Sequence, residues 1–331
     1  MLRSFYRQAL AGPFLRRQNR TMATTTGVTS RAPAVVRASE AEVGAGRFFE
    51  RNLEVAVRHV LKDGVVVIQD AINHQVLDKL NEKMKADAIT LSKSGDGTPF
   101  NYNRGNLQQD APPVRKFFDP SIFLNPLATH VTASVLGPRP KLTFMSGNTA
   151  MPATDDTPSQ RQPVHADSDF RHPSHPFALV VNVGLTDMNP NNGSTEIWLG
   201  THNDTSIDDQ EGSHGERASG RIKEDLLEER RAILPPLQPT IPKGSIIIRD
   251  LRLWHAGMPN LSSDIRVMLA MIHFAPWYRN PMRLELGEGI RPVIEAEKDL
   301  DVRADYVPEE LALSRYLNRG FGNSYDFNQT P

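Results

Sequence analysis

Two histidines, one aspartate and one arginine stand at a spacing that suits metal and carboxylate binding. His165 and Asp167 are two residues apart, His255 follows 90 residues after His165, and Arg266 comes eleven residues later. Two imidazoles and one carboxylate can occupy one face of a six-coordinate metal ion and leave three positions open, which is the ligand set of non-haem Fe(II) oxygenases. An arginine guanidinium can bind a carboxylate through two parallel hydrogen bonds.

β-Strands are the elements that would bring these side chains together. Side chains two residues apart on a strand point to the same face, so His165 and Asp167 can reach one ion. The second histidine must then arrive from a distant strand. Each polar residue borders an apolar run typical of strands, and these runs cover residues 177–183, 244–248 and 267–272. The pattern predicts a barrel of strands with a metal ion at its mouth.

Several segments carry a resemblance to a known protein family. They are His165-Ala166-Asp167, residues 192–202 (Asn-Gly-Ser-Thr-Glu-Ile-Trp-Leu-Gly-Thr-His), Lys243-Gly244-Ser245 leading to Leu253-Trp254-His255, and finally Arg266. Their order, their spacing and the Asn-Gly … Gly-Thr-His hairpin resemble the phytanoyl-CoA dioxygenase family of Fe(II)/2-oxoglutarate oxygenases. The resemblance covers most of residues 45–280.

The resemblance implies a fold, two cofactors and a set of site residues. The fold is a double-stranded β-helix, a cupin-like jelly roll that is mainly β with flanking helices. Fe(II) would be held by His165, Asp167 and His255, which are also the expected catalytic residues. The co-substrate 2-oxoglutarate would be held by Arg266. Members of the family act on very different molecules, so the substrate stays unidentified.

Further candidates for co-substrate binding lie close to these motifs. Gln162 stands three residues before His165, and Asn148 and Thr195 are also expected to donate or accept hydrogen bonds there. For these three residues a structural role is the alternative. For Arg266 the alternative is a salt bridge to an Asp or Glu, because a buried guanidinium needs an anionic partner.

A weakly periodic stretch before the barrel is the predicted substrate contact. Residues 89–118 show few periodic signals, and long loops in compact domains are often lids or binding loops. We expect residues 99–109 to form such a lid, with Tyr102 and Arg104 contacting the substrate. The alternative is an exposed loop without a binding role.

The composition limits the class of protein and its partners. The 331-residue chain has 39% hydrophobic and 23% charged residues, as is usual for a globular protein, and no cysteine for a disulfide or a thiolate metal site. A net charge of −1 gives no electrostatic reason to expect nucleic acid, and no apolar run reaches the length of a membrane helix. The expected partners are a small-molecule substrate and O2, and a homodimer is left open.

The composition of the N-terminal segment differs from that of the rest of the chain. Residues 1–36 contain arginines but no acid, as mitochondrial transit peptides do, and the alternatives are a disordered tail or a start at Met22. We expect an intracellular, cytoplasmic protein unless this segment directs it to mitochondria. Residues 37–331 are predicted as one domain with its β-helix core at about 141–280.

Periodicity predicts the elements around the core. Helices are expected at 47–62, at 74–88 and from Pro126 to Gly137 with Asn125 as its N-cap. Short strands separated by Pro, Gly, Asn and Asp follow from residue 141 onward, which favours an antiparallel jelly roll over a parallel sheet.

The residues and the resemblance together imply an Fe(II)/2-oxoglutarate-dependent dioxygenase. It would oxidise a small organic molecule by hydroxylation, desaturation or ring modification and release succinate and CO2. Two alternatives are a metal-dependent cupin-like isomerase or lyase without 2-oxoglutarate, and a non-catalytic binding protein. Arg266 argues against the first and the complete triad against the second.

Overall fold

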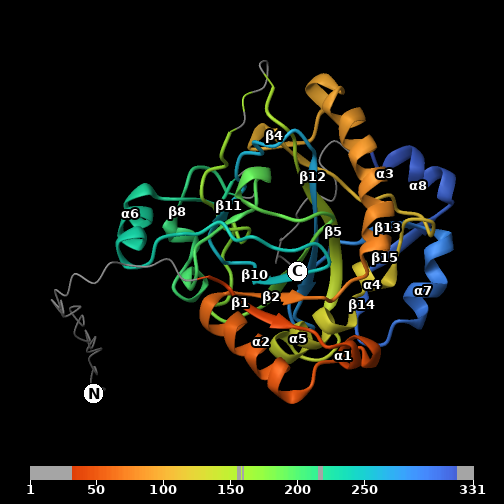
Figure 1. The fold of residues 1–331 in the computed structure, drawn as a ribbon, viewed down its shortest axis with the longest axis horizontal. Helices are drawn as coiled ribbons and strands as arrows, with labels where there is room; N and C mark the ends of the chain where they lie inside the picture. The colour runs from red at the N-terminus through yellow and green to blue at the C-terminus, as the bar shows by residue number, and fades with distance from the viewer. Residues whose placement is uncertain (1–31, 155–157, 159, 215–218, 319–331) are drawn as a thin grey trace, which may run out of the picture.

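The structure is a computed structural model that describes residues 32–154, 158, 160–214 and 219–318. In these ranges the strands form one large sheet, a smaller sheet and a separate two-stranded pair, and several helices lie against the large sheet (Figure 1). The helices are α1 (Glu40–Ala45), α2 (Glu50–Asp63), α3 (His74–Ser92), α4 (Pro120–Phe123), α5 (Pro126–Leu136), α6 (Glu224–Ile233), α7 (Arg291–Ala296) and α8 (Glu309–Arg315).

The large sheet has the strand order β1-β2-β10-β6-β12-β5-β4-β3, and β14 also pairs with β5. Its four central strands, β10, β6, β12 and β5, are antiparallel neighbours. The strands are β1 (Ala34–Arg37), β2 (Val65–Gln69), β10 (Ile246–Asp250), β6 (Ala178–Gly184), β12 (Arg266–Phe274), β5 (Lys141–Ala150), β4 (Asn103–Gln108), β3 (Phe100–Asn101) and β14 (Asp301–Val302).

The small sheet is built from short antiparallel pairings. Leu237 pairs with Ile197, Ile197 with His255, His255 with His165, and His165 with Arg221. Its named strands are β7 (Glu196–Ile197), β11 (His255–Ala256), β8 (Gln210–Glu211) and β9 (Arg221–Ile222), while β13 (Leu284–Gly287) and β15 (Ala304–Val307) form a separate parallel pair.

The chain crosses repeatedly between these two sheets. From β5 it enters the small sheet near residue 165 and returns to the large sheet in β6. It then contributes β7 and residues 237–241 to the small sheet, β10 to the large sheet, β11 to the small sheet and β12 to the large sheet. This alternation is that of a double-stranded β-helix. The predicted fold, a mainly β jelly roll with flanking helices, is confirmed.

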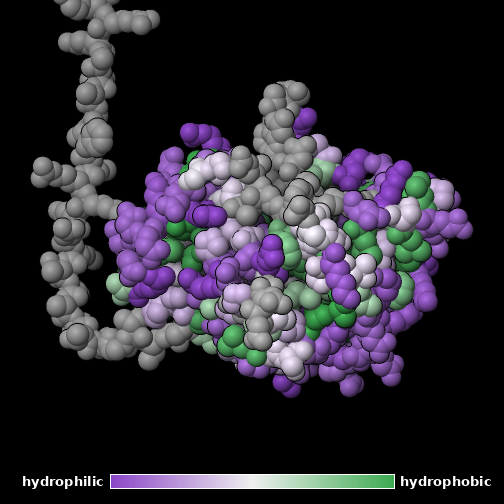
Figure 2. Space-filling model, turned by 90° about the horizontal axis from the view of Figure 1, so that it is seen from above, coloured by the Kyte–Doolittle hydropathy of each residue, from purple (hydrophilic) through white to green (hydrophobic). Residues whose placement is uncertain are grey.

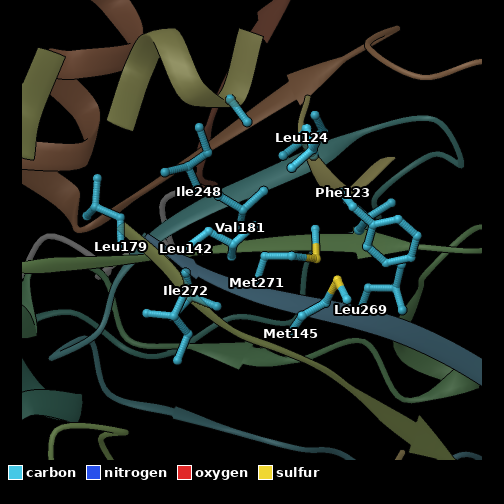
Figure 3. Close-up of a cluster of buried hydrophobic side chains, with 14 of the residues drawn as sticks. Phe123, Leu124, Leu142, Met145, Leu179, Val181, Ile248, Leu269, Met271 and Ile272 are labelled. Atoms are coloured by element: carbon cyan, nitrogen blue, oxygen red, sulfur yellow. The ribbon is translucent and has the colours of Figure 1, made fainter. Parts of the chain in front are cut away.

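Two apolar layers pack against the faces of the large sheet. Leu269 and Met271 of β12 belong to the outer layer, which also includes residues of α2, α3 and α5 (Figure 3). Met268, which directly precedes Leu269 in β12, packs instead with Ile197 of the small sheet. Successive side chains of a strand point to opposite faces, so Arg266 shares the inner face with Met268.

Local signals set the helix boundaries that the sequence predicted. The Asn125 side chain accepts hydrogen bonds from the backbone N–H groups of Leu127 and Ala128 at 3.0 and 3.1 Å, and Pro126 occupies the first turn. Gly137 ends the helix, as predicted. The other two predicted helices are found as α2 and α3, with ends shifted by a few residues.

Two regions differ from the sequence expectation. Residues 99–109 are not a loop: β3 and β4 form a hairpin whose second strand pairs with β5, and mostly polar residues hide its strand character. Beyond the expected β-helix core, but within the expected domain, the chain forms β13 to β15, α7 and α8. Finally, β1 begins at Ala34, before the domain start predicted at residue 37; most of the N-terminal segment lies outside the described residues.

Among the described helices, none is long and apolar enough to cross a membrane. On the face shown in Figure 2, hydrophobic residues form separate patches among hydrophilic ones.

Candidate metal centre

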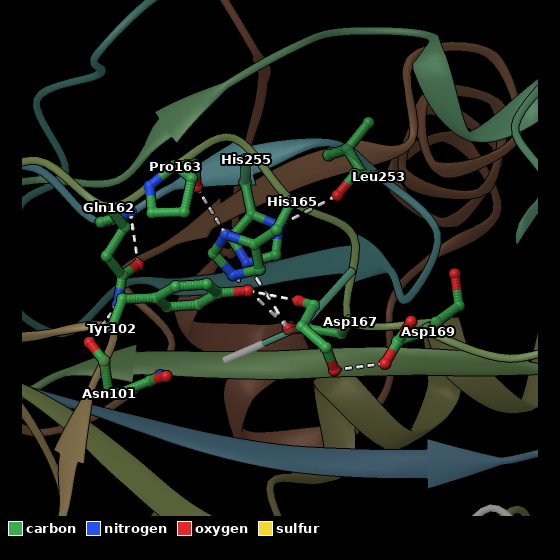
Figure 4. Close-up of polar contacts among 12 residues, drawn as sticks. Asn101, Tyr102, Gln162, Pro163, His165, Asp167, Asp169, Leu253 and His255 are labelled. Atoms are coloured by element: carbon green, nitrogen blue, oxygen red, sulfur yellow. Dashed lines mark hydrogen bonds and ion pairs between the residues drawn. The ribbon is translucent and has the colours of Figure 1, made fainter. Parts of the chain in front are cut away.

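Three side chains that can bind a metal ion converge on one point of the described structure. His165, Asp167 and His255 each offer one ligand atom, and these atoms lie within 4.8 Å of one another. Asp167 Oδ1 is 3.9 Å from His165 Nε2 and 3.7 Å from His255 Nε2. Figure 4 shows the two imidazole rings close together beside the Asp167 carboxylate.

The second nitrogen of each ring is held by the backbone. Nδ1 of His165 lies 2.9 Å from the carbonyl oxygen of Pro163, and Nδ1 of His255 lies 3.0 Å from that of Leu253. A carbonyl oxygen can only accept, so each Nδ1 carries the proton and donates it. Each Nε2 then keeps a lone pair and faces Asp167, which is how proteins orient histidine ligands of metals.

The charges of the three groups also suit a metal ion. Burial lowers the pKa of His165, and burial together with the Arg249 guanidinium holds the pKa of His255 well below its usual range. Burial alone would raise the pKa of Asp167, but Arg249 and the two imidazoles outweigh it and keep the pKa well below normal. Two neutral imidazoles and one carboxylate are the donor set of a non-haem Fe(II) site, so these residues fit the ion.

Arg249 is a member of the site that the sequence analysis missed. Its Nη2 donates to Asp167 Oδ2 at 2.5 Å and its Nε to Asn182 Oδ1 at 3.2 Å. The side chain is buried. One signal was available, because Arg249 continues the apolar run Ile246-Ile247-Ile248, where a charged residue is unusual.

Arg266 is buried on the inner face of the large sheet. Its guanidinium donates to the backbone oxygens of Gly193 (2.7 Å), Asn148 (3.1 Å) and Asn192 (3.4 Å). No described carboxylate side chain forms an ion pair with it, so the alternative of a structural salt bridge finds no support here. Burial lowers the pKa of Arg266 to about 10, at which it still carries its charge at neutral pH.

The other predicted co-substrate residues lie in different settings. Gln162 is buried, and its amide accepts from Gly257 N at 2.7 Å and donates to Asn101 O at 3.2 Å, contacts that favour a structural role. Asn148 and Thr195 are half-buried, and Asn148 stands on the inner face of β5. Co-substrate binding by these three residues stays a prediction.

The two predicted substrate contacts lie on the β3–β4 hairpin. Tyr102, at its turn with φ 66°, places its ring 4.7 Å from that of His165, and its hydroxyl donates to the carbonyl oxygen of Ser219. Burial raises the pKa of Tyr102, so its hydroxyl keeps its proton. Arg104 is exposed. The structure therefore brings Tyr102 to the metal-binding group and leaves Arg104 on the surface.

The fold is that of a double-stranded β-helix, and its triad has the donor set of a non-haem iron site. A sequence model described as phytanoyl-CoA dioxygenase (PhyH) matches residues 60–268, more than half of the chain. The chain belongs to this family. It is therefore an enzyme of the oxidoreductase type that depends on Fe(II) and 2-oxoglutarate.

Solved structures give more distant likenesses. The non-heme alpha ketoglutarate dependent epimerase SnoN from nogalamycin biosynthesis is 15% identical with a TM-score of 0.46, over 68% of this chain and 82% of that one. AviO1 from Streptomyces viridochromogenes Tue57 is 16% identical with a TM-score of 0.49, over 69% of this chain and 97% of that one. Likenesses at this level assign neither a reaction nor a substrate to this chain.

Proposed function

We propose that this protein oxidises a small organic substrate by hydroxylation, desaturation or ring modification at an iron held by His165, Asp167 and His255. The observation that carries the proposal is the convergence of two histidine Nε2 atoms on one carboxylate oxygen, with both Nδ1 atoms fixed by backbone carbonyls. This arrangement holds an ion on one side and leaves its other side open.

Arg266 supports the use of 2-oxoglutarate at this site. A guanidinium buried among backbone oxygens and without a carboxylate partner among the described residues is suited to an incoming anion. The distal carboxylate of 2-oxoglutarate fits the planar fork of an arginine.

The protein's own groups position the reactants and exclude water. With 2-oxoglutarate and O2, the bound Fe(II) supplies the oxidising chemistry, and succinate and CO2 are released. Met268 and Ile197 form part of an apolar wall between the sheets, and the Tyr102 ring covers His165. Because this wall excludes water, the local dielectric constant is low and the charge interaction between Arg266 and a bound carboxylate is stronger.

The test is succinate formation by the purified protein with Fe(II), 2-oxoglutarate and O2, compared with samples lacking the metal. A panel of small metabolites should include compounds that raise the rate, and the mass of each product separates hydroxylation (one added oxygen atom) from desaturation (loss of two hydrogens). Isomerisation or lyase chemistry without succinate, or metal-independent turnover, would refute the proposal.

A further inference from the structure

The Arg249 guanidinium connects the large sheet to the predicted metal centre, and one of its nitrogens has no partner among the described residues. Its Nε binds Asn182 on β6, and its Nη2 binds Asp167 across the barrel. Among the described residues, Nη1 is buried and has no hydrogen-bond partner. The side chain is 9% exposed, so bulk water does not replace the missing partner.

We propose that the free edge of Arg249 binds the metal-side carboxylate of 2-oxoglutarate, while Arg266 binds the distal one. The inference rests on the proposed function and extends it by a second carboxylate-binding residue. Arginine has five N–H donors in a planar fork, and Arg249 uses one edge of this fork for Asn182 and Asp167. The donors of Nη1 remain on the other edge.

The contacts of Asp167 indicate where the Nη1 edge of Arg249 can bind a ligand. Its Oδ1 atom faces both histidines, whereas Oδ2 is taken by Arg249. The carboxylate would therefore bind an ion through a single oxygen, and the Arg249 side chain stands directly beside that ion. A buried N–H without a partner destabilises the protein, so an anion that binds next to Asp167 and accepts from Nη1 is stabilised by that hydrogen bond.

The two arginines face the same space between the sheets. Both side chains lie on the inner face of the large sheet, where Arg249 contacts Asn182 and Arg266 contacts the backbone of Asn148. Asn182 and Asn148 occupy successive inward-facing rows of this sheet, about 7 Å apart along the strands. Ser146, in the row of Asn182, is also buried, and its hydroxyl has no partner in the part of the chain that the structure describes, so it is a further donor to a ligand between the arginines.

The test uses two Arg249 variants that differ in the charge and in the donors they offer to Asp167. Arg249→Gln keeps one amide donor for Asp167 but loses the charge and the second edge, while Arg249→Lys keeps the charge without the planar fork. Arg283→Gln is the matched control, because Arg283 pairs with Asp305 on the surface. Affinities for metal and then for 2-oxoglutarate are measured by calorimetry on the metal-loaded protein without oxygen.

We expect Arg249→Gln to bind 2-oxoglutarate about 10- to 100-fold more weakly, the loss of a charge-assisted hydrogen bond, with metal affinity within about threefold of wild type. The loss should persist for 2-oxopentanoate, which keeps the metal-side carboxylate, and vanish for 4-oxobutanoate, which keeps only the distal one. Arg249→Lys should fall between wild type and Arg249→Gln.

Three results separate this inference from the proposed function. If wild type binds 2-oxoglutarate and both Arg249 variants match it, the second carboxylate site is wrong and the proposed function stands. Equal losses of metal and 2-oxoglutarate would limit Arg249 to holding Asp167 and also overturn the inference. If the metal-loaded wild type binds no 2-oxoglutarate, the proposed function itself fails.

Discussion

His165 and His255 exchange both of their backbone hydrogen bonds, at 2.9 Å from His165 N to His255 O and at 3.0 Å in the other direction. Such a directly opposed pair places its two Cα atoms about 5.5 Å apart, and the ring centroids are 4.3 Å apart. The distance between the two histidine ligands is thus set by backbone pairing in the small sheet. The protein should therefore hold this arrangement with or without the ion.

Replacing any one of His165, Asp167 and His255 by Ala should abolish iron binding and succinate formation. Each residue supplies one of three ligand atoms, and two remaining ligands bind an ion weakly. The fold should persist, because the backbone pairing of the small sheet does not need the side chains. Metal titration and a thermal unfolding curve of each variant test both statements.

The matched control is His175→Ala. His175 lies ten residues after His165 but is exposed and packs beside Trp277. It should bind iron as wild type does. If His255→Ala kept wild-type iron affinity, His255 would not belong to the site.

Arg266→Ala should weaken 2-oxoglutarate much more than iron. Removing one partner of a buried charge-assisted pair costs about 2–5 kcal/mol, which is about 30- to 5,000-fold in affinity. Arg266→Lys should recover only part of this loss. The lysine keeps the positive charge, but an ammonium cannot form the two-bond fork. The measurement is the affinity for 2-oxoglutarate at saturating Fe(II), with metal content determined in parallel.

Two results would contradict this role of Arg266. An unchanged 2-oxoglutarate affinity in Arg266→Ala would show that Arg266 does not bind the distal carboxylate. A joint loss of iron and co-substrate would indicate that Arg266 supports the fold, for which its hydrogen bonds to Gly193 and Asn148 offer a route.

The sequence predicted those parts of the molecule that rest on periodicity and on local signals. The apolar runs became β6, β10 and β12, and Asn125, Pro126 and Gly137 mark a helix whose ends depend on neighbouring residues alone. The shared direction of His165 and Asp167 was predictable, because the spacing of residues in a strand fixes which side chains share a face. Their meeting with His255 was expected from the family resemblance rather than from any local pattern.

Interactions between distant strands were not predictable in the same way. Arg249 meets Asp167, 82 residues away, through a register between sheets that no local pattern encodes. The β3–β4 hairpin was missed because its residues are mostly polar, and pairing with β5 rather than burial of an apolar face makes it a strand.

Gly193→Ala should weaken 2-oxoglutarate binding as well as stability. Gly193 has φ +77°, and an added Cβ would lie 2.6 Å from the carbonyl oxygen of Met258. The shift needed to relieve this contact would move the Gly193 carbonyl that accepts from Arg266. Strain of this kind costs about 1–3 kcal/mol. Chemical denaturation and 2-oxoglutarate titration are the measurements.

Gly44→Ala serves as the control for this variant. Gly44 lies in α1 with no atom within 4 Å of an added Cβ, so alanine should stabilise the helix or leave it unchanged. Full 2-oxoglutarate affinity in a destabilised Gly193→Ala protein would show that the Gly193 carbonyl does not position Arg266.

Tyr102→Ala should lower kcat/KM for an identified substrate more than Arg104→Ala does. The Tyr102 ring lies beside His165, whereas Arg104 is exposed on β4. Tyr102→Phe keeps the ring but loses the hydrogen bond to Ser219, so it separates packing at His165 from the fixing of the hairpin. Unchanged kcat/KM values in both alanine variants would remove the hairpin from the substrate site.

His273 gives the fold a defined dependence on pH. It is buried in β12, and its Nδ1 lies 2.8 Å from Thr132 Oγ1, which itself donates to Thr129 O. Nδ1 is therefore the donor to Thr132, and the imidazole is neutral. Burial lowers the pKa of His273 to about 3.

An unfolded histidine has a pKa of about 6.5. Between about pH 6.5 and pH 3, His273 therefore binds a proton in the unfolded state but not in the folded state. The unfolded state is then favoured as the pH falls, and His273 contributes a loss of at most about 1.4 kcal/mol per pH unit in this window. His273→Asn keeps an N–H donor for Thr132 but does not titrate, so its free energy of unfolding should fall less steeply with acid. Denaturant titrations of both proteins at several pH values measure the difference in slope. Parallel slopes would mean that folded His273 takes up its proton as readily as the unfolded chain does.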